Sequence, residues 1–215
     1  MNTVSHETSD EQLAQSAQAG VMASFEELVG RYEGRLLRFL RQGCRNEADA
    51  ADLTQETFVA AYVNLARFNP ARSFATWLFI IARRKLIDHL RARRPVDEAP
   101  LPELADEDDP AVRLERRDEQ EVLWNVARSV LTPIQFDALW LRYVEEMSVA
   151  QIARVLGRLQ PHVKVILFRA RAAMAAELES RFERPDTAKA VGSESPQSRP
   201  ASPQNLSNLA IAWNP

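Results

Sequence analysis

The sequence contains little cysteine and histidine and no long apolar run. Cys44 is the only cysteine among the 215 residues, which excludes an internal disulfide and a cysteine-rich metal site. The three histidines, His6, His89 and His162, share no spacing typical of metal ligands. No apolar stretch approaches the roughly 20 residues that span a membrane, and the polar N-terminus has no secretory-signal pattern. We therefore expect a cytoplasmic protein with no membrane span, no metal site and no cofactor.

The usual signatures of an enzyme are also missing. We find no nucleophile–base set, no paired-carboxylate site and no glycine-rich phosphate loop, so we expect no catalytic residues. Only 6 glycines occur in a composition rich in Ala, Leu, Arg and Glu, which indicates helices throughout. The expected fold class is all-α.

Charge is distributed unevenly along the chain, whose net charge is −3. Residues 1–94 carry 13 basic and 11 acidic side chains, residues 95–121 carry 3 and 11, and residues 122–184 carry 9 and 6. The most basic stretch, "ARRKLIDHLRARRP" at residues 82–95, has six basic side chains and one acid. Such asymmetry indicates a polyanionic partner for the basic parts, although the totals alone fit ordinary solvated charge better.

The first block of the chain, residues 1–94, has the hydrophobic spacing of consecutive helices. We expect three of them, which cover residues 24–42, 46–68 and 73–94. Ser24, followed by Glu27, is the expected N-cap of the first helix, and Ser73 is that of the third. Pro70 interrupts the helical pattern between the second and the third. The block is therefore predicted to be a small helical domain.

A proline-rich segment separates this block from the next. Residues 95–110, "PVDEAPLPELADEDDP", hold four prolines and seven acids with no hydrophobic period, which predicts an acidic flexible linker. A second small helical domain is expected over residues 111–184, where Thr132 and Pro133 begin one of the helices. Residues 185–215 are rich in Pro, Ser, Ala and Asn, and we expect them to form a disordered tail.

The second block contains a helix-turn-helix pattern. Ser148 is the expected cap of the first helix, and Gly157 fits the position after it, where the backbone must adopt a positive φ. The second helix would place Val163, Leu167 and Ala170 inward. A helix held in this way enters the major groove with its N-terminal residues at the base edges. The candidate DNA-binding residues are Gln160, His162 and Lys164 at the bases and Arg169 and Arg171 at the phosphates. A solvated helical face is the alternative for these side chains.

The order of the motifs is more specific than any one of them. The strings "DLTQETFVAAY", "FATWLFIIARRKLIDHLR" and "LTPIQFDALWLRYVEEMSVAQIARVLG", followed by "VKVILFRARAAM", resemble bacterial RNA polymerase sigma factors of the extracytoplasmic-function type in the sigma-70 family. The resemblance spans roughly residues 10–184. It implies a region 2-like domain at 1–94 and a region 4-like domain at 111–184, with core RNA polymerase and promoter DNA as partners. The implied function is promoter recognition, DNA melting and transcription initiation.

The resemblance also assigns roles to residues in the first block. Asp52, Gln55 and Glu56 share one helix face because of their spacing, and this face would bind the polymerase. The loop "ARFNPARS" at residues 66–73 would capture a base flipped from the minus-ten element, with Arg67, Asn69 and Arg72 as candidates. The basic helix after the loop would run beside promoter phosphates through a set of four cations: Arg83, Arg84, Lys85 and Arg91.

The recognition helix departs from the family pattern at two positions. Leu159 stands where the family has a capping residue, and Ile166 stands where it has a basic one. The helix would then start one position later, and Val165, Ile166 and Phe168 would make its outer side apolar. These side chains would meet thymine methyls or a protein, for which an anti-sigma factor is the candidate. The alternative functions are a sigma-like adaptor and a free-standing helix-turn-helix regulator that acts without melting the promoter.

Overall fold

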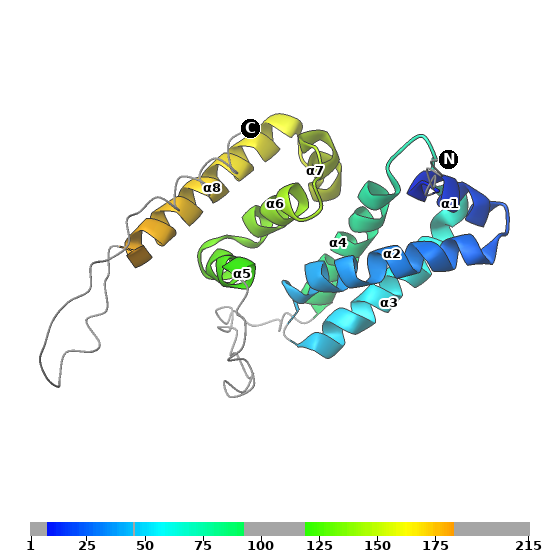
Figure 1. Cartoon of the computed structure of the whole chain (residues 1–215), viewed down its shortest axis with the longest axis horizontal. Coiled ribbons are helices and arrows are strands. Elements are labelled where there is room, and N and C mark those ends of the chain that lie inside the picture. The colour runs from blue at the N-terminus through cyan, green and yellow to red at the C-terminus, as the bar shows by residue number, and fades with distance from the viewer. Residues whose placement is uncertain (1–7, 45, 93–118, 183–215) are drawn as a thin grey trace, which may run out of the picture. The chain divides into compact units, whose positions relative to one another are not determined.

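The computed structural model describes residues 8–44, 46–92 and 119–182 (Figure 1). These residues form helices without a strand, which confirms the all-α prediction. The predicted linker at 95–110 and tail at 185–215 lie outside the described residues. The elements are α1 Asp10–Gln18, α2 Met22–Arg41, α3 Glu47–Asn64, the 3₁₀ turn η1 Leu65–Arg67, α4 Phe74–Ala92, α5 Glu119–Val130, α6 Pro133–Tyr143, α7 Val149–Leu156 and α8 Gln160–Phe182.

The chain divides into two compact units, Met1–Ser180 and Arg181–Pro215. The first unit contains all the elements except the end of α8, and of the second only residues 181 and 182 are described. The boundaries predicted from the sequence, at residues 94, 110 and 184, therefore remain predictions.

The first four helices pack in sequence order around an aromatic and aliphatic core. α2 contacts both α1 and α3, and α4 packs on α3. Edge-to-face ring pairs join α2 to α4, with centroids 5.5 Å apart for Tyr32 and Phe74 and 5.2 Å apart for Phe39 and Phe79. These four rings are almost completely buried, so large apolar area removed from water holds the helices together.

Two helix starts differ from the sequence-based expectation. The helix α1 was not predicted, although Ser9 and Gln12 form a complete capping box at its start. The prediction that Ser24 caps the next helix is wrong, because α2 begins at Met22 after Val21, which makes no side-chain cap. The other expected cap of the block is present: the Ser73 hydroxyl accepts a hydrogen bond from the Thr76 backbone N–H at 3.2 Å.

The helix-turn-helix prediction agrees with α7 and α8. Ser148 caps α7 in a capping box with Gln151, and Gly157 follows the helix in the left-handed region at φ 63°. The three side chains predicted to point inward on the second helix, Val163, Leu167 and Ala170, are buried, and Ile152, Val155 and Leu156 are buried on α7. The expected later start of the second helix is wrong, because α8 begins at Gln160 directly after Leu159.

Candidate nucleic-acid interface

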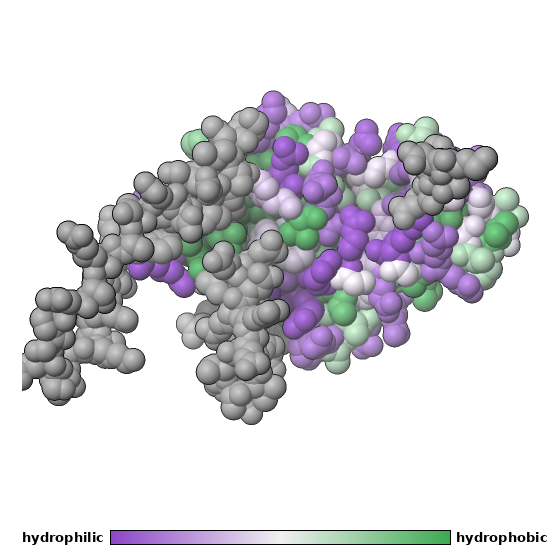
Figure 2. All heavy atoms as spheres, in the orientation of Figure 1, coloured by the Kyte–Doolittle hydropathy of each residue, from purple (hydrophilic) through white to green (hydrophobic). Residues whose placement is uncertain are grey.

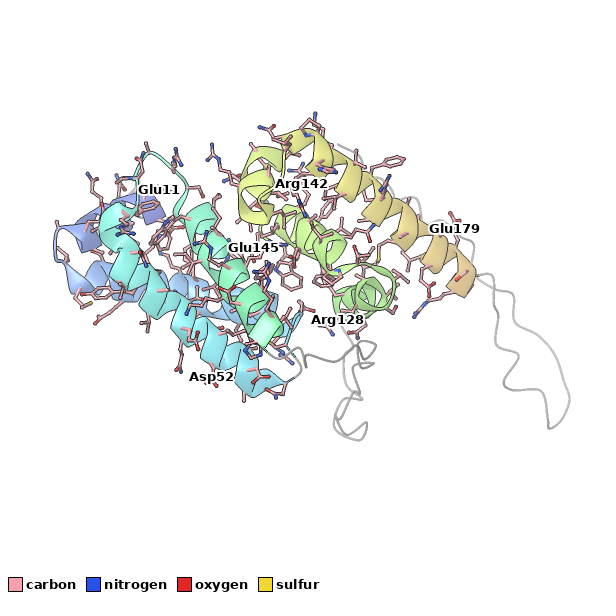
Figure 3. The ribbon with its side chains drawn as sticks, turned by 180° about the vertical axis from the view of Figure 1, so that it is seen from behind. Glu11, Asp52, Arg128, Arg142, Glu145 and Glu179 are labelled. Carbon is pink, nitrogen blue, oxygen red and sulfur yellow. The ribbon has the colours of Figure 1, made fainter. Side chains whose placement is uncertain are left out.

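The acidic and amide side chains predicted to bind polymerase lie on one exposed face of α3. Asp52, Gln55 and Glu56 are exposed, while Leu53 and Phe58 on the other side of the helix are buried. Asn46 begins the helix by accepting a hydrogen bond from the Asp49 backbone N–H at 2.8 Å. Figure 3 shows Asp52 on α3 with its side chain directed away from the helices. The face is therefore available to a partner.

Exposed apolar side chains continue this face toward the end of α3. Val59 and Val63 are among the most exposed apolar residues of the described chain, and they follow Glu56 at three and seven residues. Residues spaced in this way lie along one side of a helix. A partner that docks on Asp52 and Glu56 would therefore also meet an apolar strip.

The loop between α3 and α4 has a defined backbone turn at its tip. The Asn69 side-chain oxygen accepts from the Ala71 backbone N–H at 2.9 Å, and the Asn69 carbonyl accepts from the Arg72 N–H at 2.9 Å. Asn69 therefore shapes the turn with its oxygen, which was not anticipated from the sequence. Arg67, Asn69 and Arg72 are all exposed.

An aromatic cluster supports this loop from below. Phe68 and Phe74, at the two ends of the loop, are buried with ring centroids 5.5 Å apart. The ring of Trp77 lies 5.2 Å from Phe68 and 5.7 Å from Phe74. The ends of the loop are therefore held by a cluster of three aromatic rings, and the polar tip lies between these ends.

The four predicted cations of α4 differ in what they contact. Arg84 and Arg91 are exposed. The Lys85 Nζ lies 3.0 Å from Glu56 Oε2, and the Arg83 Nε lies 3.0 Å from Asp137 Oδ2. Burial raises the pKa of the Asp137 carboxyl above its usual value, and the neighbouring Arg83 guanidinium offsets only part of this rise. Phosphates would reach Arg84 directly. Arg91 forms only a long, exposed ion pair with Asp88 at 3.9 Å, whereas Arg83 and Lys85 would have to exchange a carboxylate partner at 3.0 Å.

Most polar candidates on α8 are accessible. Gln160, His162, Lys164 and Arg169 are exposed, and Arg171 is half-buried. Residues 160–174 contain no acid. Gln160, His162 and Lys164 lie near the start of the helix, where the orphan N–H groups and the helix dipole also favour an anion, whereas Arg169 and Arg171 lie further along it.

Exposed apolar side chains lie among these polar and basic residues of α8. The exposed fractions are 77% for Leu159, 43% for Val165 and 67% for Phe168. Ile166 is half-buried, so the exposed apolar area on this side of α8 comes mainly from Leu159, Val165 and Phe168. On the face shown in Figure 2, hydrophilic side chains dominate and hydrophobic ones are scattered among them.

A hollow beside the helix-turn-helix contains two arginines that the sequence analysis missed. Its volume is about 460 Å³, and its lining residues are Ala150, Ala153, Arg154, Gly157, Arg158, Leu159 and Gln160. Arg154 and Arg158 are exposed and adjoin the start of α8. Their place at the end of α7 and in the turn, next to a predicted recognition helix, is the signal that would have identified them.

In residues 8–44, 46–92 and 119–182, no three His, Cys, Asp or Glu side chains are grouped to hold a metal ion. Within the same ranges, no helix has both the length and the apolar character that crossing a membrane requires.

Known proteins match both halves of this arrangement. Residues 28–96 match the family model of Sigma-70 region 2, and residues 129–174 match that of Sigma-70, region 4. Both are models of transcription initiation factors. A free-standing helix-turn-helix regulator would account for the second match alone.

Three individual proteins show how far the similarity extends. RNA polymerase sigma-H factor of Pseudomonas aeruginosa is 33% identical over 181 residues, which cover 79% of this chain and 94% of that protein. ECF RNA polymerase sigma factor BldN of Streptomyces coelicolor is 32% identical over 167 residues, or 74% of this chain and 62% of BldN. The structure of CnrH in complex with the cytosolic domain of CnrY is similar over 80% of this chain and 97% of CnrH, at 31% identity and a TM-score of 0.61.

Proposed function

Because the chain belongs to the sigma-70 family of RNA polymerase sigma factors, as one of the extracytoplasmic-function type, we propose which of its surfaces carry out promoter recognition. The α3 face binds core polymerase, the loop after α3 and the helix α4 engage the minus-ten element, and α8 binds the minus-thirty-five element. The single observation that carries the polymerase assignment is the exposed triplet Asp52, Gln55 and Glu56 above a buried apolar side of α3.

Polymerase binding rests on charge and shape at α3. Two carboxylates and an amide on one helix face suit a basic surface on the partner, and such complementarity fixes register as well as affinity. Val59 and Val63 add apolar area to the same face. Removing the two charges should therefore weaken association without disturbing the core.

Minus-ten recognition rests on the loop and the cations beyond it. Arg67, Asn69 and Arg72 stand at the exposed loop, where an extruded base would be bound. Arg84 and Arg91 supply phosphate contacts that carry no sequence information but fix the position of the DNA. Binding the base only after it leaves the stack couples recognition to melting, because the loop recovers part of the unstacking cost of about 1.4 kcal/mol per step.

Minus-thirty-five recognition rests on the start of α8. In this assignment, Gln160, His162 and Lys164 contact the base edges. Arg169 and Arg171 contact the phosphates. The missed pair Arg154 and Arg158 would bind the phosphate backbone beside the start of α8. Val165 and Phe168 would contact thymine methyls.

The protein acts without a reaction of its own. The polymerase carries out the chemistry, so the chain needs no catalytic residue or cofactor. The protein would act in the cytoplasm, because polymerase and promoter DNA are located there. The acidic segment 95–110 would imitate nucleic acid within the polymerase or act as a spacer.

An inhibitory anti-sigma factor is the second partner that we propose. The observation that favours it is the exposed apolar surface on α3 and α8, which includes Val59, Val63 and Phe168. Large apolar side chains clustered with charges commonly mark protein contacts. Such an inhibitor would compete with polymerase for the α3 face.

A matched pair of double variants tests the polymerase assignment. Asp52→Asn with Glu56→Gln removes two charges from α3 while keeping side-chain shape. Glu26→Gln with Glu33→Gln makes the same change in charge on α2, where both side chains are also exposed. We expect the first pair to lower affinity for core polymerase at least tenfold and the second to leave it within twofold. Equal affinities for the two double variants would refute the assignment.

A further inference from the structure

The helix α1 contacts both ends of the loop that lies between α3 and α4. Gln18, the last residue of α1, donates its two side-chain N–H groups to the carbonyl oxygens of Leu65 and Phe68, each at 2.8 Å. Glu11, which is labelled in Figure 3, lies near the start of α1. Its Oε1 accepts a hydrogen bond from the Phe74 backbone N–H at 3.0 Å. The three backbone groups border the exposed tip at Asn69 and Arg72.

These contacts provide hydrogen-bond partners for backbone groups that neighbouring residues leave partly or wholly without one. The Leu65 carbonyl already accepts from the Phe68 N–H at 2.9 Å, and a carbonyl oxygen can accept two hydrogen bonds. The Phe74 N–H is in the first turn of α4, where a helix has no internal acceptor. The Glu11 carboxylate supplies one and also lies favourably at the positive end of the helix dipole.

The helix α1 is itself held firmly against α2. Asp10 accepts from the Arg31 guanidinium at 2.7 Å and from the Tyr32 hydroxyl. Burial and the Asp10 carboxylate raise the pKa of Tyr32, so the phenol remains protonated and donates. Leu13 and Ala14 are buried on the inner side of α1. A fixed element thus connects the core of the first four helices to the loop.

We propose that α1 is a positioning element for base recognition, in which Gln18 and Glu11 hold the two ends of loop 65–74 in the geometry that admits an extruded base. This inference rests on the proposed role of the loop in minus-ten binding. A pocket for one base must be ordered before the base arrives, because ordering it on binding would reduce affinity and selectivity. Neither Gln18 nor Glu11 would touch DNA.

The test replaces the two donors of Gln18 without changing its shape. Gln18→Glu places carboxylate oxygens against the carbonyls of Leu65 and Phe68, which should release the first end of the loop. Gln15→Glu is the matched control, because Gln15 is exposed on the same helix and the change in charge is identical. Holoenzymes of wild type and both variants are used to select single-stranded oligonucleotides from a randomised DNA library. Each base of the selected sequence is then replaced in turn by an abasic site.

The readout is the affinity ratio between the intact oligonucleotide and its abasic forms. Base stacking in a protein pocket is worth about 1–3 kcal/mol, so wild type and Gln15→Glu should lose roughly 5- to 150-fold at the captured position. Gln18→Glu should lose less than threefold there while binding core polymerase as wild type does. A ratio for Gln18→Glu equal to that of wild type would overturn the inference. If wild type has no abasic-sensitive position, the proposed role of the loop fails and the inference with it.

A second pair of variants tests the other end of the loop independently and covers the case in which Gln18→Glu does not fold. Glu11→Ala removes the acceptor for the Phe74 N–H, whereas Glu11→Gln keeps an oxygen at the same place. We expect the abasic ratio to fall at least fivefold in Glu11→Ala and to return to within twofold of wild type in Glu11→Gln. Equal ratios for the two variants would contradict a positioning role for α1.

Discussion

Lys85 on α4 and Glu56 on α3 form an ion pair with a distance of 3.0 Å between Nζ and Oε2. Lys85 is a candidate for binding promoter phosphates, and Glu56 is a candidate for binding polymerase. The two proposed interfaces therefore share a contact. If polymerase engages Glu56 as proposed, Lys85 would lose its carboxylate partner and become available to DNA.

Because of this ion pair, Lys85→Met should change the affinity for core polymerase only slightly but should reduce the salt dependence of promoter binding. An exposed ion pair contributes roughly 0.2–1 kcal/mol, so its loss should change affinity for core polymerase by less than about fivefold. Loss of one phosphate contact should lower the slope of log affinity against log salt by about one. Fluorescence titrations of holoenzyme with promoter DNA at several salt concentrations measure this slope. An unchanged slope would show that Lys85 does not reach DNA.

The outer side of α8 predicts two separable contributions to duplex binding. Lys164→Ala should weaken minus-thirty-five binding and lower the salt slope by about one, because it removes a phosphate or base contact made by a cation. Phe168→Ala should weaken binding at an unchanged slope, because an apolar contact releases no counterions. The same titrations distinguish the two variants, and identical slopes for both would contradict this division.

Thymine methyls are the proposed targets of Val165 and Phe168. Replacing one thymine of the minus-thirty-five element by deoxyuridine removes a single methyl group. Burying such a group is worth about 0.8 kcal/mol, which corresponds to about a fourfold loss of affinity per contacted methyl. The effect should vanish in the double variant Val165→Ala with Phe168→Ala. Wild-type affinity that is insensitive to every replacement would instead assign this surface to a protein partner.

Two glycines should respond to alanine with opposite signs. Gly157 has φ 63°, and no atom lies within 4 Å of an added Cβ, so Gly157→Ala should destabilise the fold by about 1–2 kcal/mol through backbone strain alone. Gly30 lies inside α2 with equal space around it, so Gly30→Ala should stabilise by about 0.5–1 kcal/mol. Urea unfolding followed by circular dichroism measures both free energies. A loss of stability in both variants would refute the strain argument.

The sequence predicts most of the helices because their signals are local. Hydrophobic spacing and the caps Ser73, Thr132 and Ser148 are short-range features that tertiary packing reinforces. The error at Ser24 came from such a local signal, since Glu27 instead bonds Arg31 one turn later at 2.5 Å. A capping pattern inside an amphipathic run does not reveal which residue starts the helix.

The interface could be predicted only as a set of residues. Resemblance to the family selects Asp52, Glu56 and Arg84, but pairing between distant segments has no local signal. The contacts of Gln18 cross 47 and 50 residues of sequence, and Lys85 reaches Glu56 across 29. Such contacts depend on how helices pack, so α1 gained its proposed role only from the structure.

Run-off transcription on host genomic DNA with purified core polymerase tests the central claim most directly. The account predicts that adding this chain produces RNA 5′ ends that share upstream minus-ten and minus-thirty-five elements. It also predicts that Asp52→Asn with Glu56→Gln greatly reduces these transcripts while Glu26→Gln with Glu33→Gln does not. A chain that binds core polymerase yet produces no new 5′ ends would contradict the account.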